Sequence, residues 1–407
     1  MSDYLPEEVV QEILNRLPVK SLIRFRCVSK SWNSLITASS FINFHLTRSL
    51  SLVPNSNTLV VRSCTASESK VVESYNFIHD DNNDDSLLNP FQNIEFSSSS
   101  FCKLIGYANG LFCLYEQDRY VLWNPSIRKC FTLPKSSLML IRGHHCCRSA
   151  FGFDSLSNDY KVVTIDFQRT DQNNQSEGKP ALVEVYSLNE GSWRVTSTRV
   201  PFPTRIIFDF GCFPAAFLNG AVHYMVNDLA NGRVPRIGDL ANGRGPRIHP
   251  SVLSFDLSNE AFRVMSLPVG MTHLYALDTS VIRGALFILC HALLCQGNKC
   301  YDVCSIWVMK KYGIVDSWTK LCNINLTGGI TRVLGFLKSG HMLVTTARAL
   351  SVGFASFNPK NREVMKLGMY GAAIDYCANN YVENLVLLDK PNDAVSQRGV
   401  TRKRKCR

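Results

Sequence analysis

The sequence predicts a small all-α module of three to four short helices, followed by an all-β, propeller-like domain of about six blades. Three observations support this prediction. Apolar residues recur at helical spacing in the first part of the chain, and the pattern then changes to short alternating or apolar runs separated by turn residues. A strand, turn, strand unit also recurs at intervals of roughly 50 to 70 residues. Hydrophobic residues make up 45% of the 407 residues and charged residues 19%, a balance typical of a folded protein.

The first predicted helix begins after Pro6, which suits the first turn of a helix. Glu7 and Glu8 place negative charge where the helix dipole favours it. Apolar residues then recur every three or four positions and form a stripe along one side of the helix. The stripe consists of Val9, Val10, Ile13, Leu14 and Leu17. Pro18 ends this helix, since proline cannot continue one.

Further short helices follow in the same region. A second runs from about Val19 to Arg26 with Leu22 directed inward, and Ser29 caps a third that carries Trp32. Phe41, Phe44 and Leu46 indicate a fourth. A module of this size buries only a limited fraction of its surface, so we expect a helical partner to complete its core.

The region after Ser49 repeats one pattern. Five segments share a strand, polar turn, strand plan, and each contains one aromatic anchor. The anchors are Trp123, Tyr186, Phe255, Trp307 and Phe357. Most are preceded by an apolar strand that a glycine introduces, as in NGLFCL and NGAVHYMV, so four strands per blade are expected. The runs NTLVVRS and KVVESYNF near the start and NLVLL at Asn384 are available to complete the ring.

The widest spacings in this repeat contain insertions that read as surface loops. One is the polar run within 167–180; the other, within 227–250, is a tandem duplication of DLANGRVPRI as DLANGRGPRI. Extra length is tolerated where the chain runs over the surface. These loops are the candidates for binding a protein substrate, near Asp171, Asn231, Arg233 and Arg244.

The N-terminal stretch LPEEVVQEILNRLPVKSLIRFRCVSKSWNSLI, from Leu5 to Ile36, resembles the F-box without a gap. The resemblance implies binding to a Skp-type adaptor protein and, through it, to a cullin. It assigns the following residues to that interface or its immediate support: Leu5, Pro6, Val9, Ile13, Leu17, Pro18, Leu22 and Trp32. Taken singly, each of these residues could equally belong to the core of the module.

The segments from about residue 50 to 390 resemble the type 1 F-box-associated domain of plant F-box proteins. Matching stretches include GYANGLFCL, FGFDSLSNDYKVV and CSIWVMKKYGIVDSWTKL. The resemblance implies substrate recognition in an SCF (Skp, cullin, F-box) ubiquitin ligase that marks a protein for proteasomal degradation. The basic tail makes the chain similar to the plant defence-regulating subset named for constitutive expression of pathogenesis-related genes. Self-incompatibility F-box proteins share both domains and remain an alternative.

Composition limits where the chain works. No apolar run reaches the length of a membrane span, since Ala285 to Cys295 is too short and reads as a buried strand. The acidic N-terminus does not resemble a secretory signal, and 15 scattered cysteines favour a reducing compartment. We therefore expect the nucleus and cytoplasm. The tail residues Arg402, Lys403, Arg404 and Lys405 are either a nuclear localisation signal or a solvated basic end. Much of the net charge of +11 lies in that tail, so no nucleic-acid groove is indicated.

No pattern singles out catalysis, a cofactor or a metal. The chain has no phosphate-binding loop, nucleophile elbow or zinc-protease helix. The cysteines near His291 and the cluster of His144, His145, Cys146 and Cys147 lack the spacing of zinc sites. A ligase adaptor needs no catalytic residue, because it raises the effective concentration of the substrate lysine near ubiquitin.

We therefore predict three parts: an adaptor-binding module at 1–48, a propeller-like substrate-recognition domain at 49–392 and a basic tail at 393–407. The alternative from another functional class is a ligand-binding or catalytic propeller with an incidental helical leader, because propeller channels also host enzymes. A pocket near the axis with convergent polar residues would favour that alternative.

Overall fold

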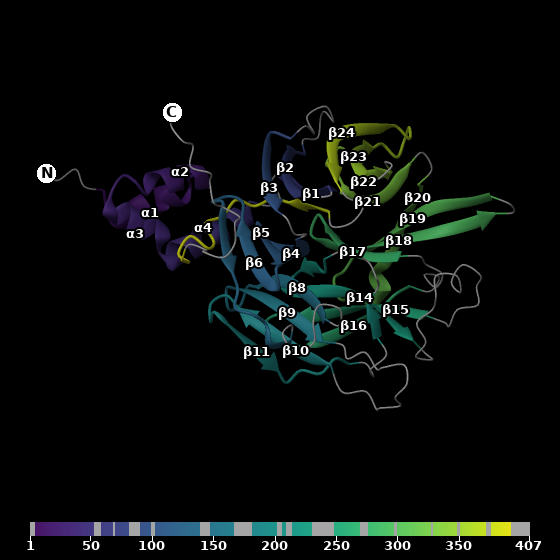
Figure 1. Cartoon of the computed structure of the whole chain (residues 1–407), viewed down its shortest axis with the longest axis horizontal. Coiled ribbons are helices and arrows are strands. Elements are labelled where there is room, and N and C mark those ends of the chain that lie inside the picture. The colour runs from purple at the N-terminus through teal and green to yellow at the C-terminus, as the bar shows by residue number, and fades with distance from the viewer. Residues whose placement is uncertain are drawn as a thin grey trace.

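The structure is a computed structural model in which a group of helices sits at one end of a ring of β-sheets (Figure 1). It describes the following residues: 5–52, 58–67, 70–80, 90–98, 102–138, 147–166, 181–201, 206–208, 214–229, 248–268, 276–296, 299–326, 329–347, 351–371 and 376–391. The predicted module of three to four helices and propeller of about six blades is confirmed, with four helices and six blades in the described residues. No helix in these ranges is long and apolar enough to cross a membrane.

Four helices form the N-terminal module: α1 (Glu7–Asn15), α2 (Val19–Phe25), α3 (Lys30–Thr37) and α4 (Ser39–Ser51). The helix starts follow the local sequence. Pro6 and Pro18 precede α1 and α2, and the Ser29 hydroxyl accepts a hydrogen bond from the Trp32 amide at 3.1 Å, capping α3 as predicted. α4 runs past residue 48, and the predicted domain boundaries stay predictions.

Six antiparallel sheets, the blades, form the ring. The first contains β1 (Thr58–Ser67), β2 (Lys70–His79), β3 (Gln92–Ser98) and β25 (Cys377–Asn380). The second contains β4 (Lys103–Ala108), β5 (Leu111–Glu116), β6 (Arg119–Asn124) and β7 (Lys129–Thr132). The third contains β8 (Cys147–Asp154), β9 (Asp159–Asp166), β10 (Leu182–Ser187) and β11 (Ser192–Thr196).

The other three blades follow the same plan. The fourth contains β12 (Ile206–Phe208), β13 (Ala216–Leu218), β14 (Ala221–Leu229), β15 (Ile248–Asp256) and β16 (Phe262–Ser266). The fifth contains β17 (Ala276–Ile282), β18 (Ala285–Gln296), β19 (Lys299–Met309) and β20 (Trp318–Asn325), with a short 3-10 helix, η3 (Val315–Ser317), before β20. The sixth contains β21 (Ile330–Phe336), β22 (Met342–Ala347), β23 (Val352–Phe357) and β24 (Val364–Gly371).

The aromatic anchors read from the sequence occupy equivalent places. Each lies on the third strand in the hydrogen-bonded order of its blade, in β6, β10, β15, β19 or β23. The strand that a glycine introduces is the second strand in the β4–β7 blade and in its counterparts, and the run from Ala285 to Cys295 lies in the strand β18, whose residues from Leu286 to Cys290 are buried. The sequence repeat therefore corresponds to the blade repeat, because both follow one antiparallel sheet.

The ring closes differently from the prediction at its C-terminal end. The expectation that NLVLL at Asn384 completes the ring is wrong: the closing strand is β25, which pairs with β1 through Leu59 and Asn380. Residues 384–388 have no strand partner, and their apolar side chains pack instead against the helical module. An apolar run alone does not distinguish a strand from a segment that fills an interface.

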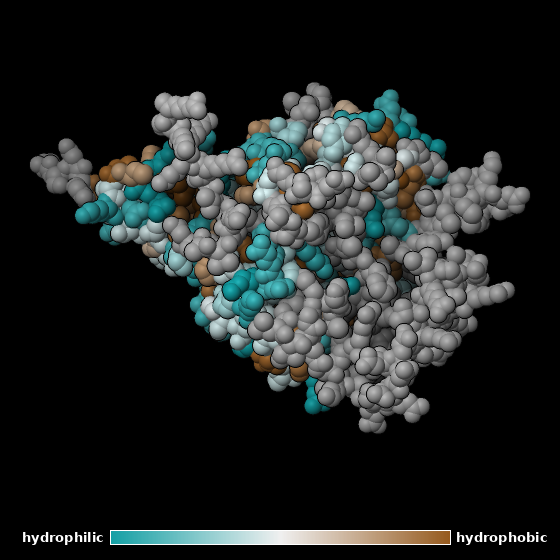
Figure 2. All heavy atoms as spheres, viewed as in Figure 1, coloured by the Kyte–Doolittle hydropathy of each residue, from teal (hydrophilic) through white to brown (hydrophobic). Residues whose placement is uncertain are grey.

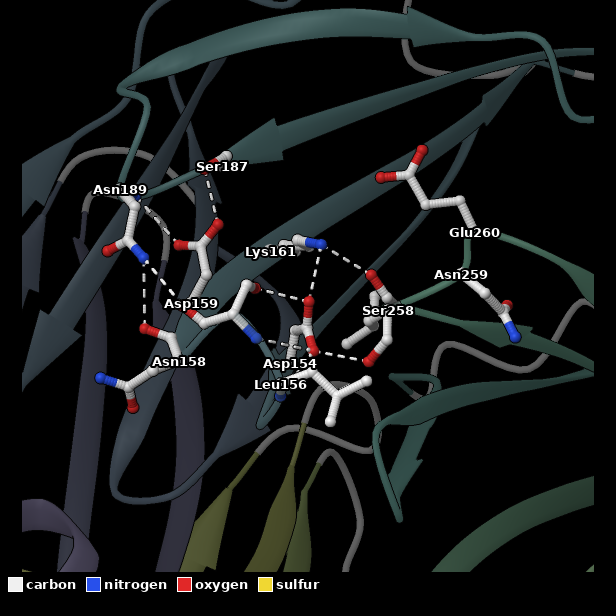
Figure 3. Close-up of polar contacts among 12 residues, drawn as sticks. Asp154, Leu156, Asn158, Asp159, Lys161, Ser187, Asn189, Ser258, Asn259 and Glu260 are labelled. Atoms are coloured by element: carbon white, nitrogen blue, oxygen red, sulfur yellow. Dashed lines mark hydrogen bonds and ion pairs between the residues drawn. The ribbon is translucent and has the colours of Figure 1, made fainter.

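Two polar features lie inside the ring. In the first blade, the fully buried Arg62 guanidinium donates to the Glu73 carboxylate at 3.2 Å and to the Cys102 carbonyl at 2.8 Å. Between the third and fourth blades, the Lys161 ammonium donates to Asp154 at 2.9 Å and to the Leu257 carbonyl at 2.7 Å (Figure 3). Buried charges of this kind persist because partners compensate them.

The antiparallel order gives the propeller two different edges. Turns between the first and second strands and between the third and fourth strands lie at one edge, which we call the turn edge, and connections between the second and third strands lie at the other. The segments 167–180 and 230–247 join β9 to β10 and β14 to β15, so their flanking strands end at the second edge, which we call the insertion edge.

Candidate partner-binding surfaces

The apolar stripe of α1 divides into a buried and an exposed part. Leu14 is 1% exposed and belongs to the core of the module. Val9 and Ile13 are 42% and 49% exposed, and Leu5, which precedes the helix, is 56% exposed. These three residues are four positions apart and so lie along one side of the helix. We call Leu5, Val9 and Ile13 the α1 face; apolar surface is visible at this end of the molecule in Figure 2.

The other residues assigned by resemblance are less accessible, apart from the prolines. Pro6 and Pro18 are exposed, whereas Leu17 and Trp32 are half-buried. Trp32 packs edge-on against Phe25 with ring centroids 5.6 Å apart. Leu22 is fully buried in the chain by itself, so it can only support an interface from behind. The interface assignment as a whole stays a prediction.

Further exposed apolar side chains on the helical module were not assigned from the sequence. Val28, which follows α2, is 62% exposed, and Phe44 on α4 is 41% exposed. From the sequence, Phe44 was named only as a sign of the fourth helix, and Val28 only lies within the stretch that resembles the F-box. Only the packing of the four helices shows which members of that pattern face outward.

A cavity of about 840 Å³ lies among the first strands of the blades. Its lining includes Leu50 of α4, so it reaches the helical module. In the wall of the cavity, an ion pair joins β17 and β21: the Arg332 guanidinium donates to the Asp278 carboxylate at 2.7 Å. Tyr107, which also lines the cavity, donates to the Asn380 carbonyl at 2.7 Å. This cavity is the axial pocket that the ligand-binding alternative requires.

The sequence FDSLSND builds a polar network at the turn edge of the third blade (Figure 3). The Asp154 carboxylate accepts hydrogen bonds from the hydroxyls of Ser157 and Ser258, each at 2.5 Å, and from Lys161. Burial acts to raise the pKa of Asp154, but these hydrogen bonds and one from the Leu156 amide outweigh it and hold the pKa well below its usual range. Because Ser258 belongs to the next blade, the network joins two blades and has a structural role.

The cysteine-rich region of β18 and β19 brings one cysteine near a histidine. The Cys304 sulfur lies 4.0 Å from His291 Nε2. Burial lowers the pKa of His291 to about 4 and raises that of Cys304 to about 12, so the imidazole and thiol are neutral at pH 7. Within the described ranges, no group of three His, Cys, Asp or Glu residues is arranged to hold a metal ion.

Several predicted sites lie outside the described residues. These are the loop positions Asp171, Asn231, Arg233 and Arg244, the cluster members His144, His145 and Cys146, and the tail residues Arg402, Lys403, Arg404 and Lys405.

Two protein-family models match the chain. A model described as the F-box domain matches residues 3–44. A model described as the F-box associated beta propeller domain matches residues 62–373. The first match contains the α1 face, and the second covers most of the propeller.

Similar curated proteins come from Arabidopsis thaliana. An F-box/kelch-repeat protein is 26% identical over 367 residues, which is 88% of each chain. The F-box protein CPR1 is 28% identical over 328 residues, covering 79% of this chain and 73% of that protein. Among solved structures, the β-propeller domain of the trilobed protease from Pyrococcus furiosus has 7% identity and a TM-score of 0.33, covering 76% of this chain and 83% of that chain.

Proposed function

Because this chain belongs to the F-box proteins that carry an F-box-associated β-propeller domain, we propose that it is the substrate-recognition adaptor of an SCF-type ubiquitin ligase. The observation that carries the proposal is the α1 face, where three apolar side chains of a small module are left outside its core. Such a surface is typical of a protein interface. A Skp-type adaptor would cover it and link the chain to a cullin.

The α1 face gives a direct test of adaptor binding. We expect the double substitution Val9→Asp and Ile13→Asp to lower affinity for a Skp-type adaptor at least tenfold, because each change would bury a carboxylate in an apolar interface. Both side chains are already exposed, so the unbound protein should remain folded. Binding is measured by titration calorimetry and folding by thermal melting.

The matched control substitutes Val195→Asp and Val364→Asp, which are exposed apolar positions on the outer strands β11 and β24. This control should bind the adaptor as the wild type does. Undiminished binding by the Val9 and Ile13 variant would refute the interface assignment, as would an equal loss in the control.

We propose that the substrate binds at the insertion edge of the propeller, through the segments 167–180 and 227–250. Their flanking strand ends support this, because both segments leave the ring at that edge. The catalytic thioester chemistry would belong to other subunits, so the chain itself would act without a catalytic residue. Replacing 167–180 or 230–247, the parts that lie between strands, with a short Gly-Ser loop should abolish capture of a protein that accumulates under proteasome inhibition and leave adaptor binding intact. Unchanged capture by both replacements would exclude the segments.

A role in plant defence and a nuclear and cytoplasmic location are proposals at a finer level. The resemblance of the chain, with its basic tail, to the defence-regulating subset supports the first, and the basic residues at 402–405 support the second. Alanine substitution of these four residues should shift a fluorescently tagged chain from the nucleus to the cytoplasm. An unchanged distribution would show that residues 402–405 are a solvated basic end and not a nuclear localisation signal.

The axial cavity supports one alternative, a ligand-binding propeller, since polar groups of Asp278 and Arg332 lie in its wall. That function would need the cavity and not the α1 face. The calorimetric test above separates the two, because a ligand-binding propeller with an incidental leader would show no adaptor binding at all.

A further inference from the structure

The segment that follows the closing strand returns to the helical module. We call residues 381–391 the strap. In Figure 1 the end of the described chain, in yellow, runs beside α4 and the β4–β7 blade. Leu385 and Leu387 of the strap are 0% and 1% exposed, and they share one core with Leu14 and Phe41 of the helices. The strap is therefore packed between the helical module and the propeller.

Directional hydrogen bonds hold the strap to the turn edge. Asn384 is fully buried, and its side-chain amide donates to the Asn109 carbonyl at 2.8 Å. The Asn124 amide donates to Asn384 Oδ1 at 2.7 Å and to the Val386 carbonyl at 2.8 Å. Because hydrogen bonds require a set geometry, these contacts fix the position of the strap more narrowly than apolar packing would.

Charged side chains extend the same attachment on both sides. The Lys129 ammonium of the propeller donates to the Leu388 carbonyl at 3.2 Å and also to the Lys390 carbonyl. On the helical side, the Ser39 hydroxyl donates to the Asp389 carboxylate at 3.2 Å. Glu383 hydrogen-bonds the backbone of Val19 at the start of α2. The strap thus contacts both domains through polar groups as well as through its apolar residues.

Backbone geometry shows how closely the strap is fitted. Leu387 has φ +76°, a left-handed conformation that is unfavourable for leucine, and yet its side chain is buried. Local strain of this kind persists only where the surroundings impose it. Gly110 lies so close that a Cβ atom there would be 2.0 Å from the Val382 carbonyl oxygen and 2.5 Å from Asn384 Nδ2. The turn at Gly110 therefore leaves no room for a side chain beneath the strap.

We propose that the strap fixes the orientation of the helical module on the propeller and thereby sets which lysines the ligase can reach. The functional part rests on the proposed adaptor role. A rigid connection holds the adaptor-bound end and the substrate-bound end at one distance, so only lysines at matching positions approach the charged ubiquitin carrier. Asn384 and Lys129 are positioning residues in this scheme, since they act by holding the strap on the propeller.

Two glycines give a matched test. Gly110 lies in the turn between β4 and β5 and Gly220 in the turn between β13 and β14; each follows an asparagine, with φ values of +88° and +75°. Alanine at either position meets the same kind of backbone strain. A Cβ atom at Gly220 meets nothing within 4 Å, whereas one at Gly110 collides with the strap. Gly110→Ala should dislodge the strap, and Gly220→Ala should leave it in place.

The measurement is single-molecule energy transfer in the full chain, with dyes on non-natural residues replacing Glu8 of α1 and Glu190 beside β11. We expect one narrow distance distribution for the wild type and for Gly220→Ala, and a broad one for Gly110→Ala. A narrow distribution for Gly110→Ala at the wild-type distance would overturn the proposal. If Gly110→Ala does not fold, two substitutions of Lys129 replace it. Lys129→Met should broaden the distance distribution, whereas Lys129→Arg, which keeps the hydrogen-bond donors, should leave it narrow. Equal distributions for these two variants would also overturn the proposal.

The functional readout is the pattern of lysines modified when the chain ubiquitinates itself in a reconstituted ligase. The wild type and Gly220→Ala should modify a restricted set, and Gly110→Ala should spread the modification over more lysines while binding the adaptor equally well. An unchanged pattern despite a broadened distance would refute the effect on lysine choice. Failure of the wild-type chain to bind the adaptor would instead refute the proposed function. The distance measurement would still test whether the strap fixes the orientation of the helical module.

Discussion

His223 shows how one buried side chain links folding to pH. It is fully buried on β14, where Nδ1 lies 3.0 Å from the Ala216 carbonyl and Nε2 lies 2.9 Å from the Tyr312 hydroxyl. A neutral imidazole satisfies both contacts, with Nδ1 donating and the tyrosine hydroxyl donating to Nε2. Burial lowers the pKa of His223 from 6.5 to about 4. The backbone hydrogen bond to Ala216 favours the protonated form and opposes this shift only in part.

The unfolded chain therefore binds a proton at His223 at a higher pH than the folded chain does. The stabilising contribution is fully present above pH 6.5 and is lost as the pH falls toward 4. We expect the urea midpoint of the wild type to drop between pH 7 and pH 5, and His223→Gln to show a smaller drop. His79→Gln, at an exposed position of β2, is the control. Equal slopes for wild type and His223→Gln would contradict this account.

At the scale of the element, α1 shows how much of a helix can be predicted. The start of the helix, its end before Pro18 and its apolar stripe followed from local sequence, because proline, charge at the first turn and residue spacing act locally. The division of the stripe did not, since Leu14 and Ile13 are neighbours of the same chemical type, and only packing against the other helices and the strap makes one buried and the other exposed. The α1 face became visible only with the packing.

This division predicts different effects on stability for two positions of one helix. Leu14→Ala should destabilise the module by about 3 kcal/mol, because it leaves a cavity in a closed core. Val9→Ala should change stability by less than about 0.5 kcal/mol, because the side chain lies at the surface and outside the core. Hydrogen exchange of the α1 amides in the full chain measures both. Similar exchange in the two variants would mean that the exposed and buried parts of the stripe are not distinct.

At the scale of the whole molecule, the blade repeat could be predicted and the ring closure could not. The anchors from Trp123 to Phe357 repeat because each blade solves the same packing problem locally. The closing strand Cys377–Asn380 is short and carries no such signal, and it is defined by its pairing with β1, far away in the sequence. The strap was mistaken for a strand for the same reason, because its partner surface exists only after the ring and the helices have met.

Two truncations separate the role of the closing strand from that of the strap. A chain ending at residue 383 keeps β25 and Tyr381, whose amide donates to the Thr58 carbonyl at 2.8 Å, and loses the rest of the strap. A chain ending at residue 371 also loses β25, which leaves β1 as an open edge strand prone to pairing with other chains.

Hydrogen exchange should distinguish the two truncations. We expect the chain ending at residue 383 to keep the protected β1 amides of the intact ring. It should lose protection in the helical module, where Leu14 and Phe41 no longer have the strap beside them. The second should lose protection in β1 as well and aggregate on heating. Equal protection of β1 in both truncated chains would show that the ring does not depend on β25 for closure. Retained protection of the helices in the chain ending at residue 383 would show that their core does not depend on the strap.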